Sequence, residues 1–365
     1  MKGLKKRAAV LAAAAALAIS GVTGCGTVNA DKVIAKVDDT EITMGLLNFY
    51  VRYQQGVYET NYAQMMGGID AMWSAEVGEG KTYEQSMKET SVELLKQMCV
   101  LEDHMDEYEI TLTEAEKEKI KKAAEEFVKA NKEEDLEAVS GDEETVERLL
   151  TLMTEQKKMH DAITAKADTE VSDDEARRKG MQYVLFSFTK TKDDGTTETM
   201  TAEEKKDLKK EAEAFAKSVK NEKDFEAFAE KNGYSAVDSS FGEGTTAPTE
   251  DMVKQLNELK VGGTTDVFES DNGYYVGRVT SELDRDATDQ RKETIVQERK
   301  QEKFKEVYEG WEKEADITED KKLLEKLDFE KQGVTLKTEE ADAENADADS
   351  ADTGNAEEST NTTEE

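Results

Sequence analysis

The chain has 365 residues and a formal net charge of -35, with lysine and arginine interspersed among the more numerous acidic residues. A surface with this charge repels nucleic acid and anionic lipid, so both are excluded as specific partners. About 300 ordered residues exceed what one hydrophobic core usually supports, which predicts two domains.

The N-terminus has the organisation of a secretory leader. Basic residues within Lys2–Arg7 precede an apolar run, Ala8–Ile19, that is too short to cross a bilayer core of about 30 Å. The run leads to Val22-Thr23-Gly24-Cys25, the pattern of a bacterial lipoprotein signal. Residues 1–24 are therefore predicted to be removed, and Cys25 to carry a lipid at the extracytoplasmic face of the cell membrane. The alternative is cleavage after Val28-Asn29-Ala30, which would release a soluble secreted protein.

The sequence pattern predicts a mainly helical region over residues 25–170. It opens with two short strands, Val33–Val37 and Glu41–Thr43, and a helix begins at Met44. Apolar residues then recur at helical spacing, and Thr113-Glu114-Ala115-Glu116 has the form of a capping box.

Residues 171–283 predict a small sheet covered by helices, in the order β-α-α-α-β-β. Gly233–Gly244 is predicted to be a glycine-punctuated loop between the second and third helices. The expected elements are the strand Gln182–Phe188, helices around Leu208–Val219, Asp224–Ala229 and Met252–Leu259, and the strands Thr265–Phe268 and Tyr274–Val279.

The remaining residues divide into a helix and a tail. Residues 284–337 carry a helix with large apolar residues on one face, from Phe304 to Trp311. Residues 338–365 contain no basic and no large apolar residue, so they cannot bury enough surface to offset chain entropy and are predicted to be disordered.

Four motifs follow one another in the second region: Phe225-x-x-Phe228-Ala229 with Tyr234-Ser235, Phe241-Gly242-Glu243-Gly244, Leu259-Lys260-Val261-Gly262 and Asn272-Gly273-Tyr274-Tyr275-Val276. In this order and spacing they resemble successive landmarks of a parvulin peptidyl-prolyl isomerase domain. The flanking regions resemble the SurA-type chaperone segment, and the chain as a whole resembles the PrsA-like foldase lipoproteins. This resemblance implies an α+β protein in which N- and C-terminal segments build one helical chaperone domain and the parvulin-like domain is inserted between them.

The resemblance also implies where the catalytic positions fall, and here the chain departs from the family. Two histidines that line the site floor in active parvulins are replaced by Tyr183 and Tyr275. The acidic or thiol position corresponds to Asp238, with Ser239 or Ser240 as alternatives. The substrate-binding positions correspond to Met252, Leu256 and Phe241.

Prolyl isomerisation makes and breaks no bond, so catalysis requires only an apolar socket and groups that stabilise the twisted amide. Phenols can replace imidazoles as hydrogen-bonding groups. We therefore predict isomerase activity that is weak or lost, with client binding retained and no cofactor. The alternative is that Tyr183 and Tyr275 are ordinary core phenols.

Other candidate residues indicate little further chemistry. His104 and His160 lie on predicted helices without ligands at metal spacing, so no metal site is expected. Cys99 lies on an apolar helix face and is predicted to be a buried thiol.

Methionines and aromatic residues near the N-terminus, among them Met65, Met66 and Trp73, suit a surface that accepts varied clients. The alternative is that they pack against the returning helix at Trp311.

Three functions fit these observations. The first is a membrane-anchored foldase that binds unfolded, newly exported polypeptides and their X-Pro segments. The second is a holdase with a degenerate parvulin domain. The third is a surface lipoprotein that binds a small solute, which predicts two α/β lobes with parallel strands.

Overall fold

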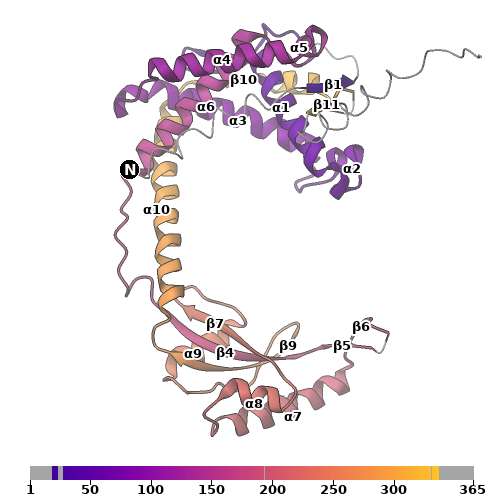
Figure 1. The fold of residues 1–365 in the computed structure, drawn as a ribbon, viewed down its shortest axis with the longest axis vertical. Coiled ribbons are helices and arrows are strands. Elements are labelled where there is room, and N and C mark those ends of the chain that lie inside the picture. The colour runs from indigo at the N-terminus through magenta and orange to yellow at the C-terminus, as the bar shows by residue number, and fades with distance from the viewer. Residues whose placement is uncertain (1–18, 24–27, 193, 330, 337–365) are drawn as a thin grey trace, which may run out of the picture. The chain divides into compact units, whose positions relative to one another are not determined.

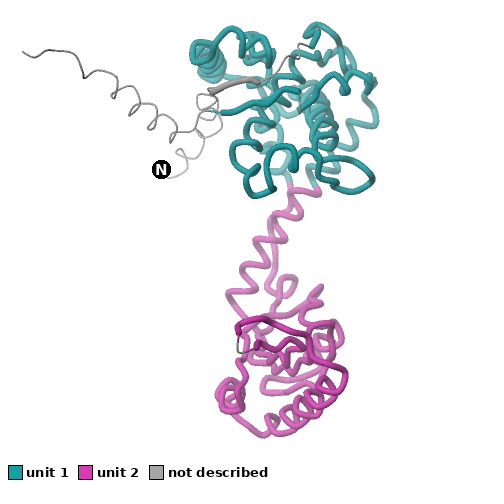
Figure 2. The backbone as a smooth tube through the Cα atoms, turned by 90° about the vertical axis from the view of Figure 1, so that its right-hand side faces the viewer, with its two compact units in different colours: residues 1–166, 303–365 teal, residues 167–302 magenta. Residues whose placement is uncertain are grey.

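The structure is a computed structural model that describes residues 19–23, 28–192, 194–329 and 331–336. Cys25 and the predicted tail, 338–365, lie outside the described residues, as does most of the predicted leader. The chain forms two compact units: unit 1 comprises residues 1–166 and 303–365, and unit 2 comprises residues 167–302 (Figure 2). Within the described residues, no helix combines the length and apolar character that crossing a membrane requires.

Unit 1 is mainly helical and carries two small antiparallel sheets (Figure 1). One sheet has the order β10-β2-β3, and the other pairs β1 with β11. The elements are β1 Ile19–Thr23, β2 Val33–Val37, β3 Thr40–Thr43, α1 Met44–Tyr62, η1 Ala63–Met66, α2 Ile69–Ser74, α3 Tyr83–Asp103, η2 Met105–Tyr108, α4 Glu114–Ala130, α5 Glu133–Val139, α6 Glu143–Thr164, the last part of α10 Arg285–Glu314, β10 Ile317–Glu319, η3 Lys321–Lys326 and β11 Gly333–Leu336.

Side-chain caps fix where several of these helices begin. The Thr43 hydroxyl accepts a hydrogen bond from the Leu46 amide, so α1 starts where the β2–β3 hairpin ends. Thr82 and Thr113 each form a reciprocal capping box, at the start of α3 and α4. The predicted hairpin, the helix from Met44 and the capping box at Thr113 are all confirmed.

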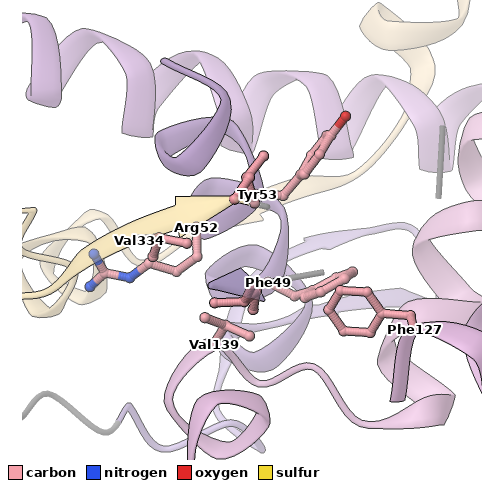
Figure 3. A pocket seen from close by; sticks show the side chains of 8 residues that line it. Phe49, Arg52, Tyr53, Phe127, Val139 and Val334 are labelled. Carbon is pink, nitrogen blue, oxygen red and sulfur yellow. The ribbon is translucent and has the colours of Figure 1, made fainter. Parts of the chain in front are cut away.

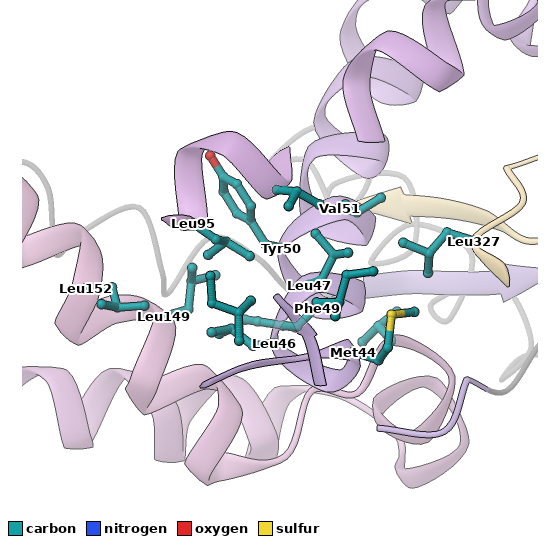
Figure 4. Close-up of a cluster of buried hydrophobic side chains, with 14 of the residues drawn as sticks. Met44, Leu46, Leu47, Phe49, Tyr50, Val51, Leu95, Leu149, Leu152 and Leu327 are labelled. Atoms are coloured by element: carbon teal, nitrogen blue, oxygen red, sulfur yellow. The ribbon is translucent and has the colours of Figure 1, made fainter. Parts of the chain in front are cut away.

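The core of unit 1 joins residues from both ends of the chain. Leu47 and Val51 of α1 pack with Leu95 of α3 and Leu149 of α6, and Leu327 of the C-terminal segment joins the same cluster (Figure 4). Burial of such aliphatic side chains contributes roughly 1.5 to 3 kcal/mol each, so the C-terminal segment is an integral part of the unit.

The buried Arg52 side chain links α1 to that C-terminal segment. Its guanidinium donates to the backbone oxygens of Gln332, at 2.9 Å, and Asp328, at 3.2 Å. Gln55 accepts a third hydrogen bond at 2.6 Å. Burial lowers the pKa of Arg52 to about 10, and the carboxylates of Glu59 and Glu84 oppose that shift.

Unit 2 is a four-stranded antiparallel sheet with the order β7-β4-β9-β8, accompanied by three helices and a small hairpin. Side chains alternate along β4, so Val184 and Phe186 join the cluster formed with α7 and α8, while Met181 joins the cluster formed with α9. The elements are β4 Arg178–Ser187, β5 Thr189–Thr191, β6 Thr197–Thr199, α7 Ala202–Val219, α8 Phe225–Lys231, β7 Ala236–Gly242, α9 Glu250–Glu258, β8 Phe268–Glu269, β9 Gly273–Ser281 and the first part of α10.

The α+β class is confirmed, but two details of the predicted order are wrong. Residues 236–242 form strand β7, where the sequence predicted a loop within Gly233–Gly244. The polar stretch after β4 forms the hairpin β5–β6. Strand β7 is a largely exposed edge strand, so it lacks the alternating apolar residues that identify a half-buried strand.

Candidate functional site

The two tyrosines that replace the family's histidines lie on neighbouring strands. Leu185 of β4 pairs with Tyr275 of β9, and Tyr183 pairs with Gly277, so the two tyrosines are diagonal neighbours. Their ring centroids are 5.6 Å apart and the rings meet edge to face at 61°. The structure therefore brings the two tyrosines together, while their catalytic role stays a prediction.

The two phenols differ in accessibility. Tyr275 is buried, and its hydroxyl donates to the side-chain oxygen of Asn272 at 3.1 Å. Tyr183 is half-buried. Of the two, Tyr183 is the more accessible phenol.

The predicted substrate-binding residues lie beside the tyrosines but inside the core. Phe241, Met252 and Leu256 have no exposed surface, and they share one apolar cluster with Tyr275. The Met252 methyl group lies over Gly277, so close that a Cβ added at that glycine would approach it to 2.7 Å. These side chains are therefore packed in the core, and their substrate-binding role stays a prediction.

Asp238 does not join this cluster. It pairs with Gln182 across β7 and β4, and the Gln182 amide donates to its carboxylate at 3.0 Å. Because side chains alternate along β4, Gln182 and Asp238 lie on the opposite face of the sheet from Tyr183. The alternative Ser239 pairs with Met181 and lies on the face of Tyr183, whereas Ser240 does not.

Sequence reasoning missed the exposed rim of this face. Val237 pairs with Tyr183 and is 43% exposed. Leu185 and Phe268 are half-buried members of the same cluster. Recognising β7 as a strand would have placed Val237 beside Tyr183, but residues 236–242 were predicted to be a loop.

A second apolar surface lies on unit 1, and we call it the Met-rich turn: Tyr62, Met65, Met66 and Ile69. All four side chains are exposed, from 43% for Ile69 to 83% for Met65. They surround η1 and the start of α2, where Gly67 and Gly68 have positive φ angles of 87° and 110°. Single exposed apolar residues are ordinary, whereas four within eight positions mark a candidate interaction surface.

Trp73 was predicted to belong to this surface, but the structure buries it. Its exposed fraction is 1%, its indole nitrogen donates to Glu59 at 2.9 Å, and its ring stacks on Tyr83 at 5.4 Å. Trp311 of the returning helix packs against the same hydrophobic cluster as Trp73, and its ring also stacks on His104 at 4.2 Å. The alternative of packing against that helix therefore stays a prediction for Trp73, whereas Met65 and Met66 are exposed. Trp73 is a core residue that supports the Met-rich turn from beneath.

The remaining candidates have packing roles. Cys99 is buried, and burial raises the pKa of its thiol to about 12, so the thiol stays protonated at neutral pH. His160 lies against Phe304, with ring centroids 5.0 Å apart. Within the described residues, no group of three or more potential ligands is arranged to hold a metal ion.

Residues 191–288 match the family described as the PPIC-type PPIASE domain. The chain therefore contains a parvulin-type domain, which confirms the resemblance on which the sequence analysis rested. The match begins after β4, so Tyr183 lies outside it, while Tyr275 and Met252 lie within it.

Among solved structures, the chain is similar to a SurA-like chaperone of Campylobacter jejuni, with 12% identity and a TM-score of 0.28, covering 80% of this chain and 100% of that one. It is similar to the foldase PrsA of Lactococcus lactis, with 13% identity and a TM-score of 0.31, covering 80% and 96%. It is also similar to PrsA of Bacillus cereus, with 18% identity and a TM-score of 0.28, covering 71% and 98%. No curated protein matches the chain.

Proposed function

We propose that this protein is an extracytoplasmic foldase, held to the cell membrane by a lipid on Cys25, that binds unfolded exported polypeptides mainly through unit 1. The parvulin-type domain of unit 2 then contributes binding of X-Pro segments and little or no isomerase turnover. The observation that carries the proposal is the parvulin-type match over residues 191–288, in a chain whose other unit presents the Met-rich turn.

Weak turnover is supported by the geometry of unit 2. An isomerase needs an apolar socket that receives the proline ring, and the side chains at the corresponding positions, Met252 and Phe241, are fully buried. The hydroxyl of Tyr275 is already engaged with Asn272. Tyr183 and Val237 leave a shallow apolar rim that can contact an extended peptide.

The isomerase arm is tested with a proline-containing tetrapeptide whose cis-to-trans conversion is followed spectroscopically. We expect a rate within about twofold of the uncatalysed reaction, and Tyr183→Phe should leave it unchanged. Turnover comparable to that of a histidine-containing parvulin domain, abolished by Tyr183→Phe, would contradict the degenerate site and favour an active isomerase.

The anchoring arm is tested by cell fractionation. The unaltered chain is expected in the membrane fraction, and Cys25→Ser should release it, because the thiol that carries the lipid is missing. Cys99→Ser is the matched control, since Cys99 is buried and distant in sequence from the leader. Retention of the Cys25→Ser chain on the membrane would contradict the proposal.

A solute-binding lipoprotein is disfavoured by the strand pairing. Every strand pair in the described residues is antiparallel, whereas that class was predicted to have parallel strands.

A further inference from the structure

One edge of strand β11 in unit 1 contacts helix α1. The other edge pairs with β1, a strand of the predicted leader. The backbone amides of Val334 and Leu336 donate to Glu59 and Thr60 of α1, at 3.2 and 3.4 Å. Because backbone groups alternate along a strand, the amide of Thr335 faces the opposite edge. That edge pairs with β1, and the sheet has no other strand in the described part of the chain.

β1 also fills an apolar groove beside β11. Phe49, Phe127 and Val139 line a small apolar pocket here (Figure 3). Ile19, which is 7% exposed, lines the same pocket, and the free space left beside it is about 10 Å³, too little for more than one water. Its backbone amide donates to the Asn131 side-chain oxygen at 2.5 Å. The groove thus recognises an aliphatic side chain and the backbone that carries it.

The groove and the β11 edge are also held by contacts that do not involve β1. Gly56 of α1 allows β11 to lie so close that an added Cβ would meet the Leu336 side chain at 3.0 Å. Arg52 holds the preceding turn through the Gln332 oxygen. A Cβ added at Gly56 would also meet the Val334 side chain at 3.1 Å, so β11 packs directly on α1.

β1 precedes Cys25, so removal of the leader deletes it from the mature protein. The mature protein would then present an open strand edge above an apolar groove, and such an edge is a template for pairing with another chain. The occupant seen here is a short extended segment that begins with an aliphatic side chain, and only uncharged residues occupy the five positions of β1.

We propose that the edge of β11 and its groove form a binding site for an extended apolar segment of a client polypeptide, and that the leader strand occupies this site until it is cleaved. The inference rests on the proposed client binding and deepens it by naming the segment class and the strand that receives it. Backbone pairing with β11 gives affinity with little sequence preference, and the groove selects one aliphatic side chain.

The probe is a fluorescent peptide with the sequence of residues 17–23, Leu-Ala-Ile-Ser-Gly-Val-Thr, and its binding is followed by anisotropy. Two forms of the protein are compared, the chain that begins at residue 25 and the full chain, both with Cys25→Ser. The shorter form should bind at least about tenfold more tightly, because the full chain carries its own competitor in cis. A peptide with aspartate in place of the isoleucine should lose at least about tenfold in affinity. Equal binding of both peptides, or equal binding by both protein forms, would overturn the inference.

A variant of β11 tests the strand edge directly. Thr335→Pro removes the amide that faces the peptide, and should weaken binding at least about tenfold. Thr197→Pro in the exposed hairpin β5–β6 of unit 2 is the matched control and should bind as the unaltered chain does. Circular dichroism checks folding, and the comparison of the two peptides still decides the inference if Thr335→Pro fails to fold.

A client-aggregation assay separates this inference from the proposed function. Protection that falls in the Thr335→Pro chain supports both. Full protection by that chain would overturn the inference and leave the foldase proposal standing. Peptide binding at β11 without any protection of clients would support the site and overturn the foldase proposal.

Discussion

The two units differ in whether the apolar side chains of their candidate binding sites are buried or exposed. Unit 2 carries the recognisable parvulin-type domain, yet Met252, Leu256 and Phe241 are buried in its core. The family match lies outside unit 1, which exposes Met65 and Met66 and pairs β1, a strand of the predicted leader, with β11. The family match therefore lies in the unit whose corresponding side chains are buried, while the Met-rich turn, the larger candidate surface for clients, lies in the other unit.

The largest difference in stability between the two units is expected when the buried Arg278 of unit 2 is substituted. Its guanidinium contacts the backbone oxygens of Val219 and Glu222 and the hydroxyl of Thr264, so it joins β9 to α7 and the turn after it. Arg278→Ala leaves these acceptors unpaired and should lower the stability of unit 2 by about 3 kcal/mol. Both tryptophans, Trp73 and Trp311, lie in unit 1.

Urea unfolding of the Arg278→Ala chain should therefore show a transition at lower urea by circular dichroism and an unchanged transition by tryptophan fluorescence. Arg52→Ala is the counterpart in unit 1 and should shift the fluorescence transition instead. If both probes moved together in both variants, the units would unfold as one and the comparison would fail.

An intermediate effect, dependent on pH, is expected at Glu155 in unit 1. Glu155 is 8% exposed, and its Oε2 has no hydrogen-bond partner among the described residues. Burial, together with the nearby charge of Glu102, raises its pKa to about 7 from an ordinary value near 4.5. The folded state therefore binds this proton more tightly than the unfolded state, and stability is lost as pH rises through 7.

Glu155→Gln keeps the side chain neutral at every pH. It should stabilise unit 1 by about 2 kcal/mol at pH 8 and by almost nothing at pH 4.5, measured by tryptophan fluorescence in urea. Glu147→Gln, on the same helix, is the control. A Glu155→Gln gain of equal size at both pH values would refute the raised pKa as its cause.

Substitutions in the Met-rich turn are expected to have the smallest effect on stability. They should nevertheless weaken the binding of clients. Met65→Ser with Met66→Ser should change the free energy of unfolding by less than about 0.5 kcal/mol, since both side chains are exposed. Protection of an aggregating client should fall about two- to fivefold. Val261→Ser removes an exposed apolar side chain of unit 2, at 51% exposure, and should leave protection unchanged.

Much of the fold could be predicted because local signals agreed with the tertiary structure. Helix α1 begins at Met44 since Thr43 caps it, and side chains alternate along β4 as the pattern of Gln182–Phe188 predicted. Strand β7 could not be predicted, because its polar residues resemble a loop and only pairing with β4 makes them extended. The misplacement of Asp238 followed from that, since the face of a residue is undefined until its strand and register are known.

The candidate surfaces were less predictable than the fold. The sequence put Met65 and Trp73 in one group, yet a buried hydrogen bond to Glu59 takes Trp73 into the core. The groove under β1 leaves no motif, because Ile19, Asn131 and Val334 are brought together from three distant parts of the chain. The predicted domain boundaries and the lipid on Cys25 stay predictions.

The contact between Arg52 and Gln332 spans 280 residues, and in the proposed function it would set an order of events during export. A chain that left a membrane pore from its N-terminus would have residues 167–302 outside while the last strand of unit 1 was still inside. The first-exported helices must therefore wait, unfinished and with apolar faces uncovered, until β11 follows them. A protein proposed to shelter emerging chains thus passes through the same vulnerable stage as its clients, and the half-built unit 1 is itself a substrate for any copy that has already folded.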